Sequence, residues 1–324
     1  YSNTRSTQNT RITQKAKTPM HNESTHNTKH QGSQYFAKAR TILLIAMPIL
    51  LMAANILWGS LDIPLGAMPD ILLGKEIEGH PSWSYIVWHS RVPQMLTATF
   101  CGAALATCGL LLQTAFRNPL AGPSILGIDS GASLGVAVAM MLFGGSITMG
   151  DLSLGGYAFT ILAALAGAVG IMVLLSILNA MLRSTVMLLI TGVIISYITG
   201  SLISLLQFWA SHDGLQAYVL WGMGNFSSVS TERLPVFIGL VSIGLVMALL
   251  MMKPLDALLL GDRYAQNLGV DTTRTRHMLL LATGLLSAIT TAFCGPISFI
   301  GLATPHMARF ISPSGSHRSL LPQT

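Results

Sequence analysis

The chain has 324 residues, of which 51% are hydrophobic and 9% charged, and its mean hydropathy is +0.60. Soluble domains carry about 25% charged residues, so this composition excludes an ordinary soluble protein and indicates a membrane protein. The net charge of +6 belongs to residues 1–40, because the remaining chain holds eleven basic and eleven acidic side chains. The basic balance therefore gives no indication of nucleic-acid binding, and none is predicted.

Residues 1–40 are predicted to be a disordered, basic cytoplasmic tail. Ser, Thr, Asn, Gln and Lys dominate it, and apolar side chains are too few to offset the entropy of ordering. It lacks the apolar segment and small-residue cleavage site of a signal peptide. A metal site at His21, His26 and His30 is a weaker interpretation than a solvated tail. Because Met20 is the first methionine, one hypothesis is that residues 1–19 are not native.

Residues 41–324 are predicted to form an all-α, polytopic helical membrane bundle. A helix that crosses the hydrocarbon core needs about 20 mostly apolar residues. Segment 214–224 is amphipathic and too short to cross, so it is expected to be a partial or re-entrant helix. The predicted spans are 41–58, 92–113, 124–143, 156–181, 187–208, 235–252 and 277–295, with 297–311 as an eighth of reduced length.

The positions of Lys and Arg predict that the N-terminus is cytoplasmic. In that orientation the inner side holds fifteen Lys and Arg, and the outer side holds three, namely Lys75, Arg91 and Arg233. An excess of these residues in cytoplasmic loops is the general rule. The outer loops 59–91 and 209–234 also carry Trp and Tyr, which are enriched at membrane interfaces.

The segment 116–135, "FRNPLAGPSILGIDSGASLG", is predicted to be an inner turn followed by a helix. Arg117 marks the cytoplasmic side, Asn118-Pro119 ends one helix, and Pro123 begins the next. Glycines then recur every four residues, at Gly127, Gly131 and Gly135. This spacing predicts a smooth face on which another helix packs closely.

Asp129 is the one acid within an apparent span. It lies in the first two turns of its helix, where a favourable contact with the helix dipole is the plainer explanation and a pore-lining role is the alternative. Proton- or sodium-coupled carriers usually place Asp, Glu or His near the membrane midplane. The scarcity of such residues disfavours a secondary transporter.

The sequence contains no recognisable catalytic or metal-binding pattern. GxxxxGK[ST], HExxH and GxSxG do not occur. Cys101, Cys108 and Cys294 lie in apolar stretches without CxxC or Cys/His spacing, so neither disulfides nor a zinc site is predicted. No His/Asp/Ser cluster occurs at helical spacing within the spans, which disfavours an intramembrane enzyme. We expect no catalytic residue, no metal and no cofactor.

The longest inner loop, 253–276, alternates charged residues with Leu and Ala at helical spacing. Gly261 and Gly269 are predicted to divide it into two short helices. Because its apolar residues lie outside the membrane, a cytoplasmic protein surface is the natural partner. The alternative is a pair of helices lying against the inner face of the bundle itself.

The run 294–310, "CGPISFIGLATPHMARF", is interrupted at Gly295-Pro296 and again at Pro305. His306 has no second metal ligand at a usable spacing, so a capping or packing histidine is the preferred interpretation.

Together these segments resemble the FecCD family of ABC-transporter permeases, the membrane subunits of importers for iron–siderophore complexes, haem and cobalamin. The motifs follow the family's order and spacing over residues 41–324. They are "RVPQML" (91–96), "GAALATCGLLLQTAFRNPLAGPSILGIDSGASLG" (102–135), "LGDRYAQNLGV" (260–270), "GPISFIGLATPHMAR" (295–309) and "SHRSLLP" (316–322).

The resemblance implies a multi-pass subunit of the bacterial inner membrane that imports a metal-chelate nutrient, iron–siderophore or haem before cobalamin. Such a permease is usually a homodimer with the translocation path at its interface. It works with two cytoplasmic ATPase subunits and an extracytoplasmic substrate-binding protein. ATP hydrolysis then belongs to another chain, and this chain is not an enzyme.

The resemblance also assigns roles to residues. Loop 253–276 matches the loop that docks into the ATPase, with contacts expected at Leu260, Gly261, Ala265, Leu268 and Gly269. Ser184 and Thr185 match the cytoplasmic gate, and Arg91 matches an arginine that pairs with a carboxylate of the binding protein. The structural motif positions are Arg117, Asn118, Pro119, Pro123, Gly127, Gly131, Pro305, His306 and Arg309.

Two features depart from the family pattern. The outer motif usually reads Arg-x-Pro-Arg, whereas position 94 is Gln94. One docking ion pair would then be missing unless Lys75 or Arg233 substitutes. The family also continues for two further helices after "HRSLLP", so about eight of ten helices are expected here. A truncated, non-functional remnant is therefore an alternative function, as is a secondary transporter.

Overall fold

A computed structural model of the protein describes residues 42–43, 46–59, 61–75, 77, 79–144, 147–149, 152–154, 156–181, 185–311 and 321. The chain divides into two compact units, 1–49 and 50–324. Of the first unit, residues 42–43 and 46–49 are described, and they are helical. The predicted tail over 1–40 and the "SHRSLLP" segment, apart from Leu321, lie outside the described residues.

Proline marks the start of several helices in the first half of the bundle. It occupies the first turn of α2 and α3, where the missing N–H costs no hydrogen bond. In α4 the proline follows a π-helical turn inside the continuous helix Pro81–Phe116. An apolar helix over Ala46–Leu57 comes before them. The elements are α2 (Met68–Leu72), α3 (Pro81–Ile86), the π-helical turn η1 (Val87–Arg91), α4 (Val92–Phe116), the 3₁₀ turn η2 (Pro123–Leu126), α5 (Ile128–Ala137) and the π-helical turn η3 (Val138–Leu142).

Side-chain caps begin two helices of the second half. Ser211 Oγ accepts a hydrogen bond from the N–H of Gly214 at α8, and Asp271 Oδ1 accepts one from the N–H of Arg274 at α12. The elements are α6 (Tyr157–Met181), α7 (Thr185–Trp209), α8 (His212–Gly222), the 3₁₀ turn η4 (Phe226–Ser228), α9 (Leu234–Leu250), α10 (Met252–Leu259), α11 (Asp262–Asn267), α12 (Thr272–Cys294) and α13 (Ile300–Ile311).

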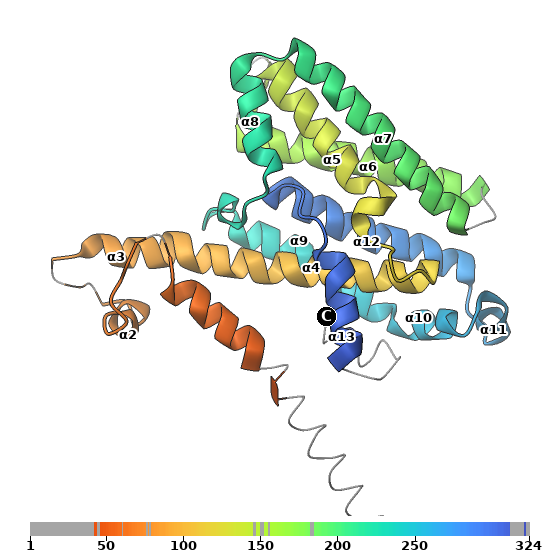
Figure 1. Ribbon diagram of the computed structural model, residues 1–324, viewed down its shortest axis with the longest axis horizontal. Helices are drawn as coiled ribbons and strands as arrows, with labels where there is room; N and C mark the ends of the chain where they lie inside the picture. Colours follow the sequence, from red (N-terminus) through yellow and green to blue (C-terminus); the bar gives the residue numbers. More distant parts are fainter. Residues whose placement is uncertain are drawn as a thin grey trace, which may run out of the picture. The chain divides into compact units, whose positions relative to one another are not determined.

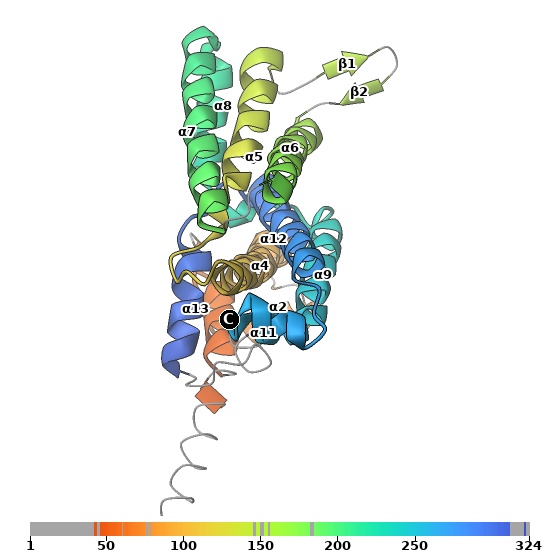
Figure 2. The ribbon, with the colours of Figure 1, turned by 90° about the vertical axis from the view of Figure 1, so that its right-hand side faces the viewer.

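A small β-hairpin joins η3 to α6 (Figure 2). Strands β1 (Ile147–Met149) and β2 (Leu152–Leu154) pair antiparallel, with Ile147 opposite Leu154. This hairpin was not expected from the sequence. It lies between helices and leaves the helical class of the bundle unchanged.

The helical membrane bundle predicted from the sequence is confirmed, but several helices are shorter than the predicted spans. Within the described part of the chain, four helices are long and apolar enough to cross a membrane: Pro81–Phe116, Tyr157–Leu178, Val186–Trp209 and Thr272–Cys294. Helices α9 and α10 pass the same test only as a pair, bent by 49°. The predicted spans 41–58, 124–143 and 297–311 fall on the shorter helices Ala46–Leu57, Ile128–Leu142 and α13.

The helix predicted to begin near Pro123 begins at Ile128 instead. Pro123 starts the 3₁₀ turn η2, and Gly127 follows it with φ +76°. That left-handed conformation, which glycine adopts without steric cost, ends the turn before α5 starts. The four residues of η2 therefore belong to the connection rather than to the span.

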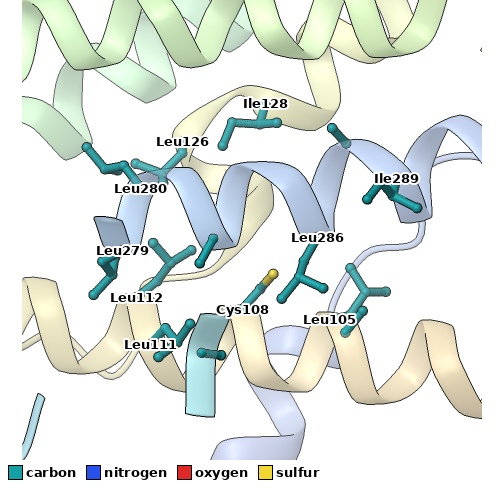
Figure 3. Packing of buried hydrophobic residues seen from close by; sticks show 14 of the residues in the cluster. Leu105, Cys108, Leu111, Leu112, Leu126, Ile128, Leu279, Leu280, Leu286 and Ile289 are labelled. Atoms are coloured by element: carbon teal, nitrogen blue, oxygen red, sulfur yellow. The ribbon is translucent and has the colours of Figure 1, made fainter. Parts of the chain in front are cut away.

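Helix α12 is the central helix of the second unit. Figures 1 and 2 show it between α4 and α9 on one side and α5 and α6 on the other, and contacts join it to all four. In its most apolar stretch 78% of the residues are buried, compared with 17% in α6 and 28% in α7. Figure 3 shows the packing at its centre, where Leu279 and Leu286 of α12 point toward α4 and Leu280 lies beside Leu126 on the other side of α12.

Glycines allow two pairs of helices to approach closely. A Cβ atom added at Gly131 would lie 2.6 Å from the carbonyl oxygen of Gly167, and one at Gly135 would overlap the carbonyl of Ala163. Two of the three glycines of the predicted face, Gly131 and Gly135, therefore pack against α6. Gly127 precedes the helix, and a Cβ atom added there would lie 3.0 Å from the carbonyl oxygen of Gly192 in α7. Gly109 of α4 and Gly301 of α13 meet in the same way, backbone against backbone.

Candidate functional site

The segment from α10 to α11 has the two short helices that the sequence predicted. Leu255 and Leu258 of α10 are buried against the bundle, whereas Leu259 is exposed. Gly261 separates the helices with φ +115°, and Gly269 follows α11 with φ +82°. Both conformations are strained for any residue with a Cβ atom, so glycine is required at these breaks.

The five residues expected to contact an ATPase fall into two groups in the structure. Leu260 and Leu268 are 65% and 58% exposed, so their side chains are available to a partner. Ala265 is fully buried and packs inward. Gly261 and Gly269 shape the backbone. Coupling at this segment stays a prediction, and the two leucines are the residues of the set able to make direct contact.

A three-way ion pair lies at the start of α11. Asp262 Oδ1 accepts a hydrogen bond from Arg117 Nη2 at 3.0 Å, and Asp262 Oδ2 accepts one from Arg276 Nη2 at 2.7 Å. Arg117 Nη2 also donates to the carbonyl oxygen of Leu258 at 3.2 Å. The carboxylate therefore joins the end of α4 to the start of α12 through α11. The sequence indicated Arg117 as a motif residue but not this pairing, because Arg117 and Asp262 are 145 positions apart.

An open hollow of about 490 Å³ adjoins this ion pair. Arginine side chains, a carboxylate and two exposed apolar or aromatic side chains border it, so it offers both charge and apolar contact to a partner. Its lining residues are Arg117, Leu260, Gly261, Asp262, Arg263, Tyr264 and Asn267.

Hydrogen bonds join helix α13 to the last turns of α4 and to the connection that follows it. His306 Nε2 donates to the carbonyl oxygen of Pro119 at 3.0 Å, and Arg309 Nη1 donates to Gln113 Oε1 at 2.7 Å. Gln113 Nε2 in turn donates to the carbonyl oxygen of Leu302 at 3.3 Å. The motif residues of the two segments thus contact each other, and His306 takes part through a hydrogen bond to the backbone.

The turn itself has the geometry of a helix end. Arg117 adopts a left-handed conformation with φ +46°, and Asn118 Oδ1 accepts from the N–H of Leu120 at 2.9 Å. Pro119 and Pro123 flank the extended part of the connection, and Pro305 lies inside α13.

The predicted gate is only partly within the described residues. Ser184 lies outside them, and Thr185 is the first residue of α7. A gating role for the pair stays a prediction.

Arg91 is buried near the predicted outer surface, and among the described residues its Nε has no hydrogen-bond partner. The residue is 4% exposed, and its guanidinium donates to the carbonyl oxygens of Ile56 at 2.8 Å, Leu57 at 3.0 Å and Leu61. It thereby caps the end of the helix Ala46–Leu57, whose last carbonyls have no partner within the helix. An ion pair with a binding protein would require it to leave these carbonyls, so its docking role stays a prediction.

The two cations that could replace the missing arginine of the outer motif are both exposed. Lys75 Nζ lies 2.8 Å from Asp70 Oδ1, and this hydrogen bond raises the pKa of Lys75 above its ordinary value. The Arg233 guanidinium lies 4.2 Å from the centre of the Tyr157 ring, within cation–π distance.

Asp129 is enclosed by hydroxyl groups from two elements. Its carboxylate accepts hydrogen bonds from Ser124 Oγ at 3.0 Å, Thr291 Oγ1 at 3.1 Å and Ser287 Oγ. The residue is 8% exposed and lies in the first turn of α5. It is thus a buried contact between α5 and α12 rather than a side chain on an open surface. The four-residue spacing of Ser287 and Thr291 on one face of α12 was the sequence signal that could have revealed the pairing.

Within the described residues no group of three or more His, Cys, Asp and Glu is arranged to hold a metal ion. Cys101, Cys108 and Cys294 are free and buried.

The comparisons with known proteins agree with this architecture. The sequence model of the FecCD transport family matches residues 44–324. The vitamin B12 import system permease protein BtuC of Salmonella paratyphi A and of Salmonella typhi is 34% identical over 268 residues, which are 81% of this chain and 79% of each relative. A solved chain assigned to a metal-chelate type ABC transporter, in an inward-facing conformation, superposes with a TM-score of 0.73 at 27% identity. This match covers 88% of this chain and 83% of that chain.

A helical membrane bundle with these matches is the permease subunit of an ABC importer, a transport subunit rather than an enzyme. The chain belongs to the FecCD transport family.

Proposed function

We propose that this permease carries a metal-chelate nutrient across the bacterial inner membrane, with cobalamin as the first candidate and iron–siderophore complexes or haem next. The observation that carries the proposal is the 34% identity to permeases named for vitamin B12 import. It changes the order of substrates expected from the sequence, which placed iron–siderophore and haem first. The metal-chelate type of the structural neighbour supports the broader class.

We further propose that two cytoplasmic ATPase subunits dock on α10 and α11. Leu260, Tyr264 and Leu268 expose apolar or aromatic surface there, and the neighbouring hollow is lined by Arg117 and Arg263. Apolar side chains outside a membrane favour a protein partner, and flanking charges set its orientation. The hydrolytic energy would then come from the partner chains.

The transport path is proposed to lie between two copies of the permease, with Ser184 and Thr185 at its cytoplasmic gate. Thr185 is the first residue of α7, and only 28% of the residues in the most apolar stretch of this helix are buried. Its exposed apolar surface supports a contact with a second copy of the permease or with lipid. A substrate-binding protein is proposed to dock on the opposite, outer side through Arg91, or through the exposed Lys75 and Arg233.

The experiment is an uptake assay with the permease, its ATPase and its binding protein in proteoliposomes. Labelled cyanocobalamin, ferrichrome and haemin are supplied in turn, with and without internal ATP. We expect uptake of cyanocobalamin that requires ATP. Uptake driven by an ion gradient without the ATPase would indicate a secondary transporter. ATP-dependent uptake of ferrichrome or haemin instead of cyanocobalamin would make that probe the proposed substrate.

Docking is tested in the same preparation with Leu260→Asp/Leu268→Asp. A charge at each exposed leucine should abolish co-purification of the ATPase, because the apolar contact would have to bury a carboxylate. Thr273→Asp is the matched control, since Thr273 is exposed in the first turn of α12 and a carboxylate is favourable there. Equal ATPase binding in the double variant and the control would place docking elsewhere.

A further inference from the structure

We propose that Asp262 is the positioning residue that transmits movement of α11 to two membrane helices at once, α4 and α12. The inference rests on the proposed docking of an ATPase at α10 and α11, and it adds the link by which that docking would reach the spans.

The first observation is the division of the carboxylate between two helices. Each oxygen of Asp262 accepts from a different arginine, Arg117 at the end of α4 at 3.0 Å and Arg276 in α12 at 2.7 Å. Charge-assisted hydrogen bonds of this kind are stronger and more directional than neutral ones. A displacement of Asp262 therefore acts on both helices together.

The second observation is that α11 cannot hold its position alone. It has six residues, Asp262–Asn267, and isolated helices of that length are unstable in water. Gly261 precedes it and Gly269 follows it, so flexible backbone bounds it on both sides. Its location depends on tertiary contacts, namely buried Ala265, the hydrogen bond from Gln266 to Thr272, and Asp262. Thr272 is in α12, whereas Asp262 also reaches α4.

The third observation concerns the conformation of Arg117. It is one of two non-glycine residues with positive φ in the described part of the chain, and such residues are uncommon. Glycine would serve better as the residue after a helix end. The arginine in this position brings its guanidinium to Asp262 and to the carbonyl oxygen of Leu258. The local strain is thus compensated by contacts that bind α10 and α11 to α4.

Solvent limits the strength of the link without removing it. The side chains of Arg117 and Asp262 are 49% and 42% exposed, and the Arg276 side chain is 28% exposed. Isolated exposed pairs contribute little to stability, but one carboxylate shared by two arginines from fixed helices forms a network. We therefore expect loss of Asp262 to alter coupling more than folding.

The test uses the complete permease in lipid nanodiscs and proteoliposomes, with its ATPase and binding protein and with labelled cyanocobalamin as the transported probe. The variants are Asp262→Asn, Arg276→Gln, the double variant and the conservative Asp262→Glu. Asp271→Asn is the matched control, because Asp271 is an exposed carboxylate of the same loop and asparagine keeps its N-cap.

Two quantities are measured, the cyanocobalamin moved per ATP hydrolysed and the hydrogen exchange of residues 258–268 and 114–121. We expect the transport-to-hydrolysis ratio to fall about five-fold in Asp262→Asn and Arg276→Gln, as loss of a charged link predicts, and exchange to rise in both segments. The transport-to-hydrolysis ratio of the double variant should be no lower than that of Asp262→Asn. Asp262→Glu should recover part of the ratio, and Asp271→Asn should match the wild type.

A wild-type ratio in Asp262→Asn would overturn the inference. So would a parallel fall of uptake and hydrolysis, because a merely structural role removes both in proportion. If the wild-type chain binds no ATPase or moves no cyanocobalamin, the proposed function fails. The link is then judged by hydrogen exchange in the permease alone. Faster exchange in both segments of Asp262→Asn supports it, and unchanged exchange at 114–121 overturns it.

Discussion

Asp129 brings a carboxylate into the interior of the bundle, where water cannot solvate it. Three hydroxyl groups, from Ser124, Ser287 and Thr291, replace that solvation. Removing the partner of a buried polar group costs more than the hydrogen bond itself contributes, because the remaining group stays desolvated. The residue therefore holds the start of α5 to the central helix α12.

We predict that Asp129→Asn and Asp129→Ala destabilise the protein to different degrees, because only alanine removes every acceptor for the three hydroxyl groups. Asparagine keeps the size and an acceptor oxygen, so the loss of unfolding free energy should be about 1–2 kcal/mol, whereas alanine leaves three hydroxyls without their acceptor and should cost about 3 kcal/mol. Chemical unfolding in detergent measures both.

Uptake by the same variants distinguishes an ATP-driven permease from an ion-coupled carrier. The asparagine variant should retain most ATP-driven uptake. Complete loss of uptake in a stably folded Asp129→Asn protein would show that an ionisable group is required there, as in a secondary transporter.

At the scale of elements, the contact between α5 and α6 depends on backbone meeting backbone. Gly131 and Gly167 face each other, and Gly135 faces Ala163. In lipid, apolar surface gives helices little reason to associate, so close packing of this kind supplies much of the attraction.

We predict that Gly135→Val separates α5 from α6, because its side chain would overlap the carbonyl oxygen of Ala163. Overpacking of a tight contact costs about 1–3 kcal/mol, and here the obstacle is backbone that cannot rotate away. The midpoint of thermal unfolding in detergent should fall. Gly170→Ala in α6 is the control, since a Cβ atom there meets nothing within 4 Å. A Gly135→Val protein as stable as this control would contradict the packing argument.

At the scale of the whole molecule, the charges of the loops determine how the bundle lies in the membrane. The excess of Lys and Arg on one side predicts a cytoplasmic N-terminus and a cytoplasmic position for α10 and α11, where the proposed ATPase would dock.

We predict that a membrane-impermeant maleimide labels Lys75→Cys from outside the cell and Arg263→Cys only after the membrane is opened. Both positions are exposed, and the three native cysteines are buried, so background labelling should be low. Labelling of Arg263→Cys in intact cells would reverse the orientation, and it would remove the proposed ATPase site.

The sequence predicted well those features of the fold that depend on a pattern within a single segment. The glycine spacing at Gly131 and Gly135 predicted a close-packed face, and Gly261 and Gly269 predicted two short helices. The start of α5 was misplaced, because Pro123 begins a 3₁₀ turn rather than the helix. The carbonyl partners of Arg91 and the pairing of Asp262 with Arg117 were not predictable, since they lie 30 or more positions away along the chain. For Asp129, the four-residue spacing of Ser287 and Thr291 was a signal that could have revealed the contact with α12.

The sequence by itself determined that this protein is a helical membrane bundle of the FecCD family, because hydropathy, loop charge and motif order are properties of the chain read locally. Only the tertiary structure decided that Asp129 is a buried contact, that Arg91 caps a helix, and that Asp262 joins α4 to α12. The physical reason is that a polar group buried or shared between helices must find its partner in space. Many Ser, Thr and Arg residues could serve, and packing around α12 selects among them.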